Sequence, residues 1–376
     1  MGEEITKVTI IAIVSIAILI VIATYVNNVI NPGLAAWPWP VDPSLEDELE
    51  NISGKFGIVT NNKAGQYRPD IYENTVVWVD NRNSLRDNIY LRNLSERTER
   101  RLASHPSGQS DPSIYGNIVV WQDYRNGQNN SDIYMLDITD PLGTPPTRIT
   151  TELSDQVNPV IYKDIIVWES YDVLASPNID IFMHDLKDPL GVNTQVTNTP
   201  NIQEIYPDVY EDYIVFQTEI DPQYHRYNIS VYSISNGTSH LASPSSNYQN
   251  TPAIDNYKIV WAEGHPYQGI KSNIYMLDLK QPGIGKKQLS FGNQNHSFDP
   301  AIHGDRIVWE TSFNAGLNID LFMHNLADPI GQNYRISGNP SHQVDPAIYG
   351  NRIVWTDYRN SNPPDFNTDI YMFEVL

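Results

Sequence analysis

Seven copies of one sequence unit fill most of this 376-residue chain and constrain its fold more than any other feature. Each copy has an aromatic residue after a short apolar run, and a proline precedes that aromatic residue by nine positions. The aromatic residues, spaced by 43 to 48 positions, are Trp78, Trp121, Trp168, Phe216, Trp261, Trp309 and Trp355. A second motif of the type Asp-Ile-Tyr follows each of them. A period of about 40 to 50 residues with several short strands is typical of the blades of a β-propeller.

One unit contains four strand signals, at residues 112–115, 118–122, 133–138 and 148–151. These segments are rich in β-branched and aromatic residues, which suit strands, and Gly-Asn and Asn-Gly pairs between them suit turns. No long segment after residue 53 has helical periodicity. We therefore predict an all-β fold over residues 54–376, a seven-bladed β-propeller of four-stranded blades. Its repeats begin near residues 66, 109, 156, 204, 249, 297 and 343.

The two ends of the repeat region complement each other. The seventh unit ends at Leu376 on its third strand, and residues 55–60 resemble a fourth strand without a unit of its own. We predict that this N-terminal strand completes the last blade, which closes the ring and leaves no free sheet edge inside it.

A nearly unbroken apolar run covers residues 8–26. As a helix it would span roughly 30 Å, the thickness of the hydrocarbon core of a bilayer. Lys7 precedes it and no basic residue follows until Lys55, which places the N-terminus in the cytoplasm. We predict a membrane anchor at 1–30 with one transmembrane helix, a Pro-rich acidic stalk at 31–53, and an extracellular propeller on a single-pass cell-membrane protein. A cleaved signal peptide and a filament-type N-terminal helix remain alternatives.

The composition excludes several classes of function. The chain has 24 Lys and Arg against 45 Asp and Glu, a net charge of −21, which argues against nucleic acid as a partner. It has no cysteine, which excludes disulfides, thiolate metal sites and a cysteine nucleophile.

The repeat has the pattern Pro-x-Ile-Tyr-Gly-Asn-x-Ile-Val-Trp, followed by Asp-x-Arg-Asn and then Asp-Ile-Tyr-Met. It resembles TolB-like and WD40-like (PD40-type) propeller repeats, and most of all those of membrane-anchored or secreted surface proteins of methanogenic archaea. The resemblance implies the propeller fold but no particular activity. The α/β domain that accompanies the TolB propeller has no counterpart here. Oligogalacturonate lyases have a similar propeller with histidines around a metal, so the resemblance also leaves an enzyme open.

Polar residues stand just before each proline, where a seven-fold repeat would arrange them around one mouth of the central channel. They are Gln66 and Arg68, Gln109 and Asp111, Gln156 and Asn158, Glu204 and Tyr206, Gln249 and Thr251, Ser297 and Asp299, and Gln343 and Asp345. Such carboxylates and amides can hold a cation or sugar hydroxyls, so we predict a ligand site there. Alternatively, they satisfy backbone groups within the blades. The only cofactor expected is such a cation; the sequence leaves a metal undetermined and assigns no catalytic residue.

Three further features are open to more than one interpretation. An Asp-x-Arg motif after the tryptophan, as at Asp123 and Arg125, indicates a hairpin with an internal ion pair rather than a calcium loop. His184 and His324 occupy matching places in two units, which favours a structural role. The fourth unit is the most divergent and has Ser230 in the place of a tyrosine, through drift or for a function.

Several Asn-x-Ser/Thr sequons would carry glycans if the propeller faces outward. The glycosylation candidates are Asn51, Asn93, Asn129, Asn236 and Asn295, and Asn228 is less suited because it begins a strand.

The leading functional expectation is a membrane-anchored binding or scaffold protein of the cell envelope that contacts proteins or glycans through the propeller faces, whose loops can vary on a rigid scaffold. The alternatives are an extracellular enzyme that acts on polysaccharide or peptide, and a subunit of a surface filament.

Overall fold

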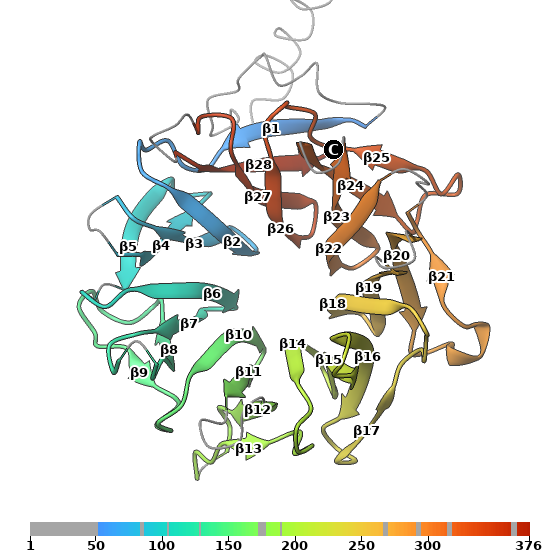
Figure 1. Cartoon of the computed structure of the whole chain (residues 1–376). Coiled ribbons are helices and arrows are strands. Elements are labelled where there is room, and N and C mark those ends of the chain that lie inside the picture. Colours follow the sequence, from blue (N-terminus) through green and yellow to red (C-terminus); the bar gives the residue numbers. More distant parts are fainter. Residues whose placement is uncertain are drawn as a thin grey trace, which may run out of the picture. The chain divides into compact units, whose positions relative to one another are not determined.

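The computed structural model describes residues 52–376 except 83–85, 104, 128, 172–177, 189, 266–269, 291–294, 314–317 and 362–366. Seven four-stranded antiparallel sheets are arranged as blades around a common centre (Figure 1), which confirms the predicted propeller. The predicted anchor at 1–30 and nearly all of the predicted stalk at 31–53 lie outside the described residues. Within the described part of the chain, no helix has the length and apolar character needed to cross a membrane.

In blades 1 to 4 the strands follow the chain from the centre outward. Blade 1 has β2 (Gln66–Tyr72), β3 (Thr75–Asp80), β4 (Asn88–Asn93) and β5 (Thr98–Ala103). Blade 2 has β6 (Gln109–Tyr115), β7 (Ile118–Asp123), β8 (Asp132–Asp137) and β9 (Thr147–Arg148). Blade 3 has β10 (Gln156–Tyr162), β11 (Ile165–Tyr171), β12 (Ile179–Asp185) and β13 (Thr194–Gln195). Blade 4 has β14 (Glu204–Tyr210), β15 (Tyr213–Asp221), β16 (Arg226–Ser233) and β17 (Thr238–Leu241).

The remaining blades have the same order. Blade 5 has β18 (Tyr248–Asp255), β19 (Lys258–His265), β20 (Ile270–Asp278) and β21 (Lys287–Gln288), with a 3-10 turn η4 (Pro282–Ile284) before the last strand. Blade 6 has β22 (His296–His303), β23 (Arg306–Phe313), β24 (Asn318–Asn325) and β25 (Asn333–Arg335). Blade 7 has β26 (Gln343–Tyr349), β27 (Arg352–Asp357) and β28 (Asp369–Val375).

The fourth strand of blade 7 comes from the other end of the repeat region. β1 (Gly54–Ile58) pairs antiparallel with β28, so the first and last strands lie side by side (Figure 1). Phe56 of β1 packs its ring against Trp355, with centroids 6.1 Å apart, and against Phe373, at 5.0 Å. The predicted closure by an N-terminal strand is therefore confirmed.

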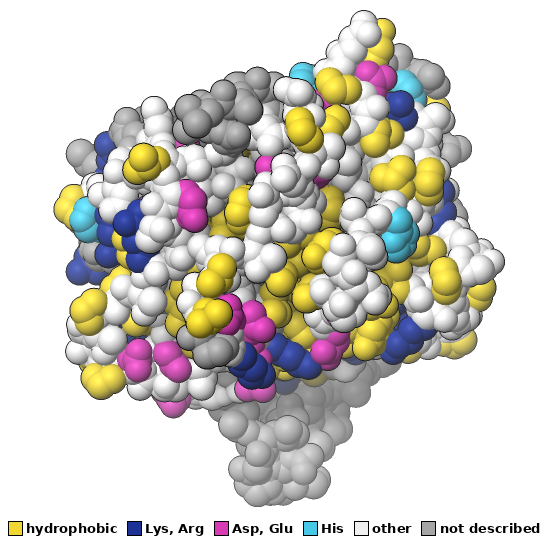
Figure 2. Space-filling view, turned by 90° about the horizontal axis from the view of Figure 1, so that it is seen from below, with side chains coloured by type: hydrophobic (Ala, Val, Ile, Leu, Met, Phe, Trp, Pro, Cys, Tyr) yellow, Lys and Arg dark blue, Asp and Glu magenta, His cyan; other side chains and the backbone are white. Residues whose placement is uncertain are grey.

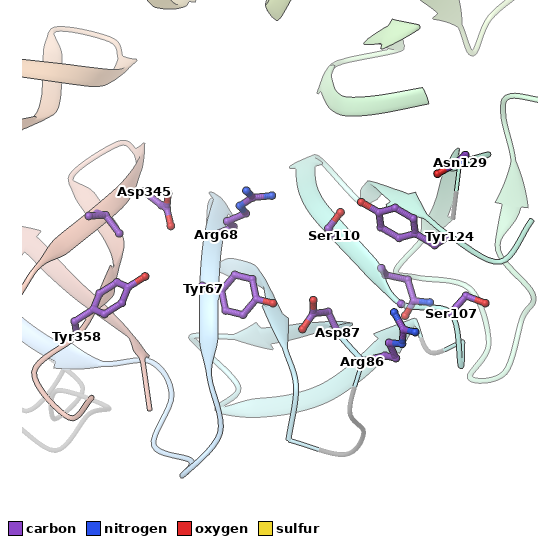
Figure 3. A pocket seen from close by; sticks show the side chains of 13 residues that line it. Tyr67, Arg68, Arg86, Asp87, Ser107, Ser110, Tyr124, Asn129, Asp345 and Tyr358 are labelled. Carbon is purple, nitrogen blue, oxygen red and sulfur yellow. The ribbon is translucent and has the colours of Figure 1, made fainter. Parts of the chain in front are cut away.

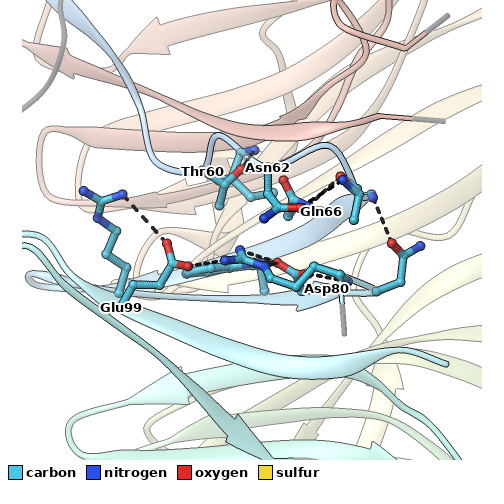
Figure 4. Close-up of polar contacts among 12 residues, drawn as sticks. Thr60, Asn62, Gln66, Asp80 and Glu99 are labelled. Carbon is cyan, nitrogen blue, oxygen red and sulfur yellow. Dashed lines mark hydrogen bonds and ion pairs between the residues drawn. The ribbon is translucent and has the colours of Figure 1, made fainter. Parts of the chain in front are cut away.

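The repeated aromatic residues lie on the second strands and form the core between blades, where each is at most 1 % exposed. In three blades the indole N–H donates to an Asp two positions on, and that Asp also pairs with an arginine in the next turn. In blade 1, Arg82 contacts both Asp80 and Glu99 (Figure 4). These contacts confirm the predicted hairpins with an internal Asp–Arg pair.

A second circle of aromatic residues lies at the C-terminal ends of the inner strands, opposite the ends that contain the prolines. Neighbouring tyrosines of blades 7, 1, 2, 3 and 4 have ring centroids 4.7 to 4.8 Å apart. Blades 5 and 6 contribute Tyr257 and His303, which lie 5.3 Å from Tyr210 and 4.4 Å from Tyr349. One end of the channel is thus lined by aromatic side chains, and the polar residues gather at the other.

In blade 7, the buried hydroxyl of Thr60, just after β1, binds the backbone of β28. Loss of this hydroxyl should destabilise the closure of the ring. Thr60 is 1 % exposed, and its Oγ1 accepts a 2.8 Å hydrogen bond from the backbone N–H of Ile370. We expect Thr60→Val to lower the free energy of unfolding by about 1–3 kcal/mol, because that N–H loses its acceptor. Urea unfolding measures the change. Thr60→Ser keeps the hydroxyl and should stay near wild type; a valine variant as stable as the serine variant would refute this explanation.

Candidate functional site

The central channel has one polar mouth, and a backbone irregularity builds it. Each inner strand has a β-bulge at its proline, which has no N–H to donate to the ladder and is tolerated in sheets at such irregularities. All seven residues before the prolines adopt a left-handed conformation with φ between 46° and 54°. These mouth residues are Arg68, Asp111, Asn158, Tyr206, Thr251, Asp299 and Asp345. Non-glycine residues rarely adopt this conformation, so its sevenfold repetition fixes the mouth side chains in one direction.

The mouth residues surround a cavity of about 770 Å³ at the centre of the propeller. The seven prolines and a further layer that includes Asp70 also line it. The fold therefore brings together one residue of each predicted pair, the one directly before the proline.

The other members of the predicted pairs lie elsewhere. Gln66, Gln109, Gln156, Glu204, Gln249, Ser297 and Gln343 are at most 6 % exposed, and none of them lines the central cavity. Several glutamines donate to carbonyl groups of the preceding loop, as Gln66 does to Ala64 (Figure 4) and Gln156 to Ser154. They thus satisfy backbone groups within the blades, the alternative that the sequence left open.

The charges of the mouth gather on four adjacent blades, in the order Asp299, Asp345, Arg68, Asp111 along blades 6, 7, 1 and 2. Blades 3, 4 and 5 contribute the uncharged Asn158, Tyr206 and Thr251. We call the first group the charged arc. The ring is therefore asymmetric in charge although its backbone repeats.

Arg68 lies between two carboxyl groups of the charged arc. It forms an ion pair with Asp111. Burial raises the pKa of Asp345, an effect that Thr356 and the charge of Arg68 oppose. Burial also raises the pKa of Asp299, and the neighbouring charge of Asp345 adds to the increase. The arc thus combines an ion-paired carboxylate with two solvent-exposed carboxyl groups whose pKa values are raised.

A second layer supports the mouth from behind. Glu310 Oε1 accepts a 2.8 Å hydrogen bond from the backbone N–H of Asp345, and Glu169 Oε1 accepts one of 2.8 Å from that of Tyr206. Likewise, Gln217 Oε1 accepts a 2.6 Å hydrogen bond from the backbone N–H of Thr251. Burial raises the pKa of Glu310 to about 9 and that of Glu169 to about 7. Sequence reasoning missed both glutamates, although each directly follows a repeat tryptophan.

A second cavity, of about 810 Å³, adjoins the charged arc and shares Arg68 and Asp345 with the central one. Tyr67, Tyr124 and Tyr358 line it, and Figure 3 shows Tyr67 pointing toward Asp87. Burial and the hydrogen bond with Asp87 raise the pKa of Tyr67. Three phenol rings beside polar side chains make a surface on which sugar rings can stack.

The structure also places the predicted histidines and sequons. His184 and His324 make equivalent contacts, at 2.9 and 2.8 Å, with Asn193 and Asn333, which confirms their structural role. Within the described ranges, no three His, Asp or Glu side chains form a group that could hold a metal ion. Of the glycosylation candidates, Asn129 lines the second cavity, of about 810 Å³. Asn236 is exposed, and Asn93 and Asn295 are half-buried. Asn51 lies outside the described residues.

Comparisons with known proteins show the fold. No protein-family model and no curated protein match the chain. The propeller domain of the Trilobed protease from Pyrococcus furiosus has a TM-score of 0.63 at 13 % identity, over 82 % of this chain and 93 % of that one. Acylaminoacyl peptidase from Pyrococcus horikoshii has a TM-score of 0.62 at 14 % sequence identity, and the match covers 83 % of this chain but only 52 % of that one. An oligogalacturonate lyase in complex with manganese has a TM-score of 0.61 at 11 % sequence identity, and the match covers 88 % of this chain and 95 % of that one.

A solved structure also supports the predicted similarity of this chain to TolB-like propellers. A protein described as TolB from Agrobacterium tumefaciens has a TM-score of 0.50 at 12 % identity, over 78 % of this chain and 99 % of that one. At these identities the likeness is one of fold. The finer resemblance to surface proteins of methanogenic archaea has no support among the comparisons.

The same comparisons correct the leading functional expectation. The structural neighbours named first are propellers of a protease, a peptidase and a lyase, and none of them shows membrane anchoring or a binding role. The expectation of a membrane-anchored binding or scaffold protein is therefore overturned. The neighbours agree better with the alternative of an enzyme on a propeller scaffold.

Proposed function

We propose that the chain is a hydrolase that cleaves glycosidic bonds of a neutral polysaccharide at the charged arc. The observation that carries this proposal is the placement of Arg68 between Asp111 and Asp345 at the edge of both cavities. Glycoside hydrolysis needs one carboxylic acid that holds a proton and one carboxylate that is ionised. A carboxyl group with a raised pKa, Asp345, near an ion-paired carboxylate, Asp111, fits such a pair of roles.

The roles follow from the surroundings of each group. Asp345 would give its proton to the leaving glycosidic oxygen as the bond from that oxygen to the anomeric carbon breaks. Asp111 would take a proton from the attacking water, or bond to the anomeric carbon until water replaces it. Arg68 would hold Asp111 in place, and Tyr67, Tyr124 and Tyr358 would bind neighbouring sugar rings.

The substrate class follows from charge and size. The whole chain has a net charge of −21, so a polyuronide would be repelled. Cavities of about 770 and 810 Å³ are large enough for several sugar units. The lyase is matched over nearly its full length, which supports an enzyme whose catalytic unit is a single propeller. The chain spans about half of the peptidase, so that likeness supports a peptide substrate less well.

An assay on a panel of polymers tests the proposal. The full-length protein is incubated with neutral glucans, mannans, galactans and xylans, with polygalacturonate, and with oligopeptides. We expect new reducing ends from at least one neutral glycan and no cleavage of the peptides. Unsaturated products from polygalacturonate, or cleavage confined to peptides, would contradict the proposal, as would inactivity on every neutral glycan.

A further inference from the structure

Blade 4 lacks an aromatic pair that the other six blades have. In those blades a phenyl or phenol ring of the third strand stacks on the tryptophan of the second, with centroids 6.1 to 6.5 Å apart. In blade 4 the paired residues are Phe216 and Ser230. A cavity of about 290 Å³ lies at this place, lined by Phe216, Ser230, Thr218 and Glu204 among others. The cavity therefore includes the place of the missing ring, at Ser230.

A buried carboxyl group faces this space without a partner on one oxygen. In blade 3 the equivalent Gln156 accepts a 2.7 Å hydrogen bond from the indole N–H of Trp168. Blade 4 has Phe216 instead, which has no N–H to donate. Glu204 is 3 % exposed and its carboxyl group has hydrogen bonds with Thr197 and Thr199, but within the described part of the chain its Oε2 has no partner. A buried carboxyl oxygen without a donor is costly, and a ligand that supplies one would be favoured.

The wall of the cavity favours a cation. Its described lining contains no Lys or Arg, and Asp180 lies close enough to raise the pKa of Glu204. Burial is the largest cause of that increase, to about 7, and His240 is the other ionisable residue of the lining. A positive donor beside Glu204 would offset both the burial and the charge of Asp180.

We propose that blade 4 binds a small aromatic amine, whose ring packs on Phe216 in the space of the missing tyrosine and whose ammonium group donates to Glu204 Oε2. Blade 6 offers a comparison within the same chain. Its cavity of about 230 Å³ still has Trp309 and Phe322, and hydroxyl and amide side chains but no carboxyl group line it. That cavity should not distinguish an amine from a neutral compound of the same shape.

Calorimetric titration of the full-length protein with benzylamine, and with benzyl alcohol as its neutral counterpart, tests this site. At pH 8 we expect a dissociation constant of about 0.1–1 mM for benzylamine, as for a fragment of its size, and binding at least tenfold weaker for the alcohol. Glu204→Gln should weaken benzylamine binding about tenfold or more and leave the alcohol unchanged. Lowering the pH to 5.5 should weaken benzylamine binding to the wild type, since Glu204 then holds a proton.

The double substitution Phe216→Trp with Ser230→Tyr restores the pair found in other blades and should abolish benzylamine binding. The proposal fails if this variant binds benzylamine as wild type does, if Glu204→Gln has no effect, or if no binding occurs at 10-fold above the expected range. Should the double variant not fold, the Glu204→Gln result alone decides. Because binding is measured without any glycan, the outcome is independent of the proposed hydrolase activity.

Discussion

Replacing Asp111 by asparagine should lower kcat on the best neutral glycan by about a thousandfold or more, because the variant loses the carboxylate that is paired with Arg68 and proposed to activate water or attack the sugar. The fold should persist. Asp111 has a φ of 50°, and Asn158 occupies the equivalent position of blade 3 with a φ of 51°, so asparagine suits this backbone. Reducing-end assays measure the rate, and thermal unfolding checks that the variant is intact.

Two further variants separate a catalytic role from a general effect of charge. Asp140→Asn removes one exposed carboxylate from the same blade and should leave kcat unchanged. Asp345→Asn removes the proposed proton donor, so its loss should be much smaller on an aryl glycoside with a good leaving group than on the polysaccharide. Asp111→Asn should be impaired on both substrates. Near-wild-type rates for Asp111→Asn would remove Asp111 from the mechanism.

The repeat made the architecture predictable. Because each unit repeats the same proline, aromatic and Asp-Ile-Tyr signals, the sequence alone predicts the blade number, the strand order and the closure by residues 55–60, and β1 pairs with β28 as expected. The fourth strand of blade 2 was less predictable. It comprises only Thr147–Arg148, since the outermost strand has a neighbour on one side alone and its pattern is weak.

The site was predicted only in part, and the β-bulge explains why. Gln66 and Arg68 both stand just before Pro69, so both were expected at the channel mouth. In a regular strand, residues i and i+2 would indeed share a face. The bulge between Tyr67 and Asp70 breaks this alternation, and Gln66 is buried while Arg68 faces the cavity. The contact between Glu310 and the backbone of Asp345 joins different blades, and such pairing follows from ring geometry that the repeat pattern does not contain.

The largest expected effect on stability comes from Glu310. Its pKa of about 9 in the folded protein exceeds the 4.5 of an unperturbed glutamic acid, so the folded state retains a proton that the unfolded chain releases. The resulting stability is complete below about pH 4.5 and is lost progressively as the pH rises to about 9. Glu310→Gln keeps an oxygen for the backbone N–H of Asp345, as Gln217 does for Thr251, but cannot ionise. We therefore expect it to raise the free energy of unfolding on the order of 4 kcal/mol at pH 8 and by less than about 1 kcal/mol at pH 5.

The reciprocal change at the same position of blade 4 provides the matched control. Gln217→Glu introduces a carboxyl group at a site that is 2 % exposed, so its stability should fall as the pH rises from 5 to 9, opposite in sign to the gain from Glu310→Gln. Urea unfolding at pH 5, 7 and 9 measures both variants against wild type. If the stability difference between Glu310→Gln and wild type stays the same across that range, Glu310 is already ionised in the folded protein. The layer behind the charged arc would then carry a negative charge next to the backbone of Asp345.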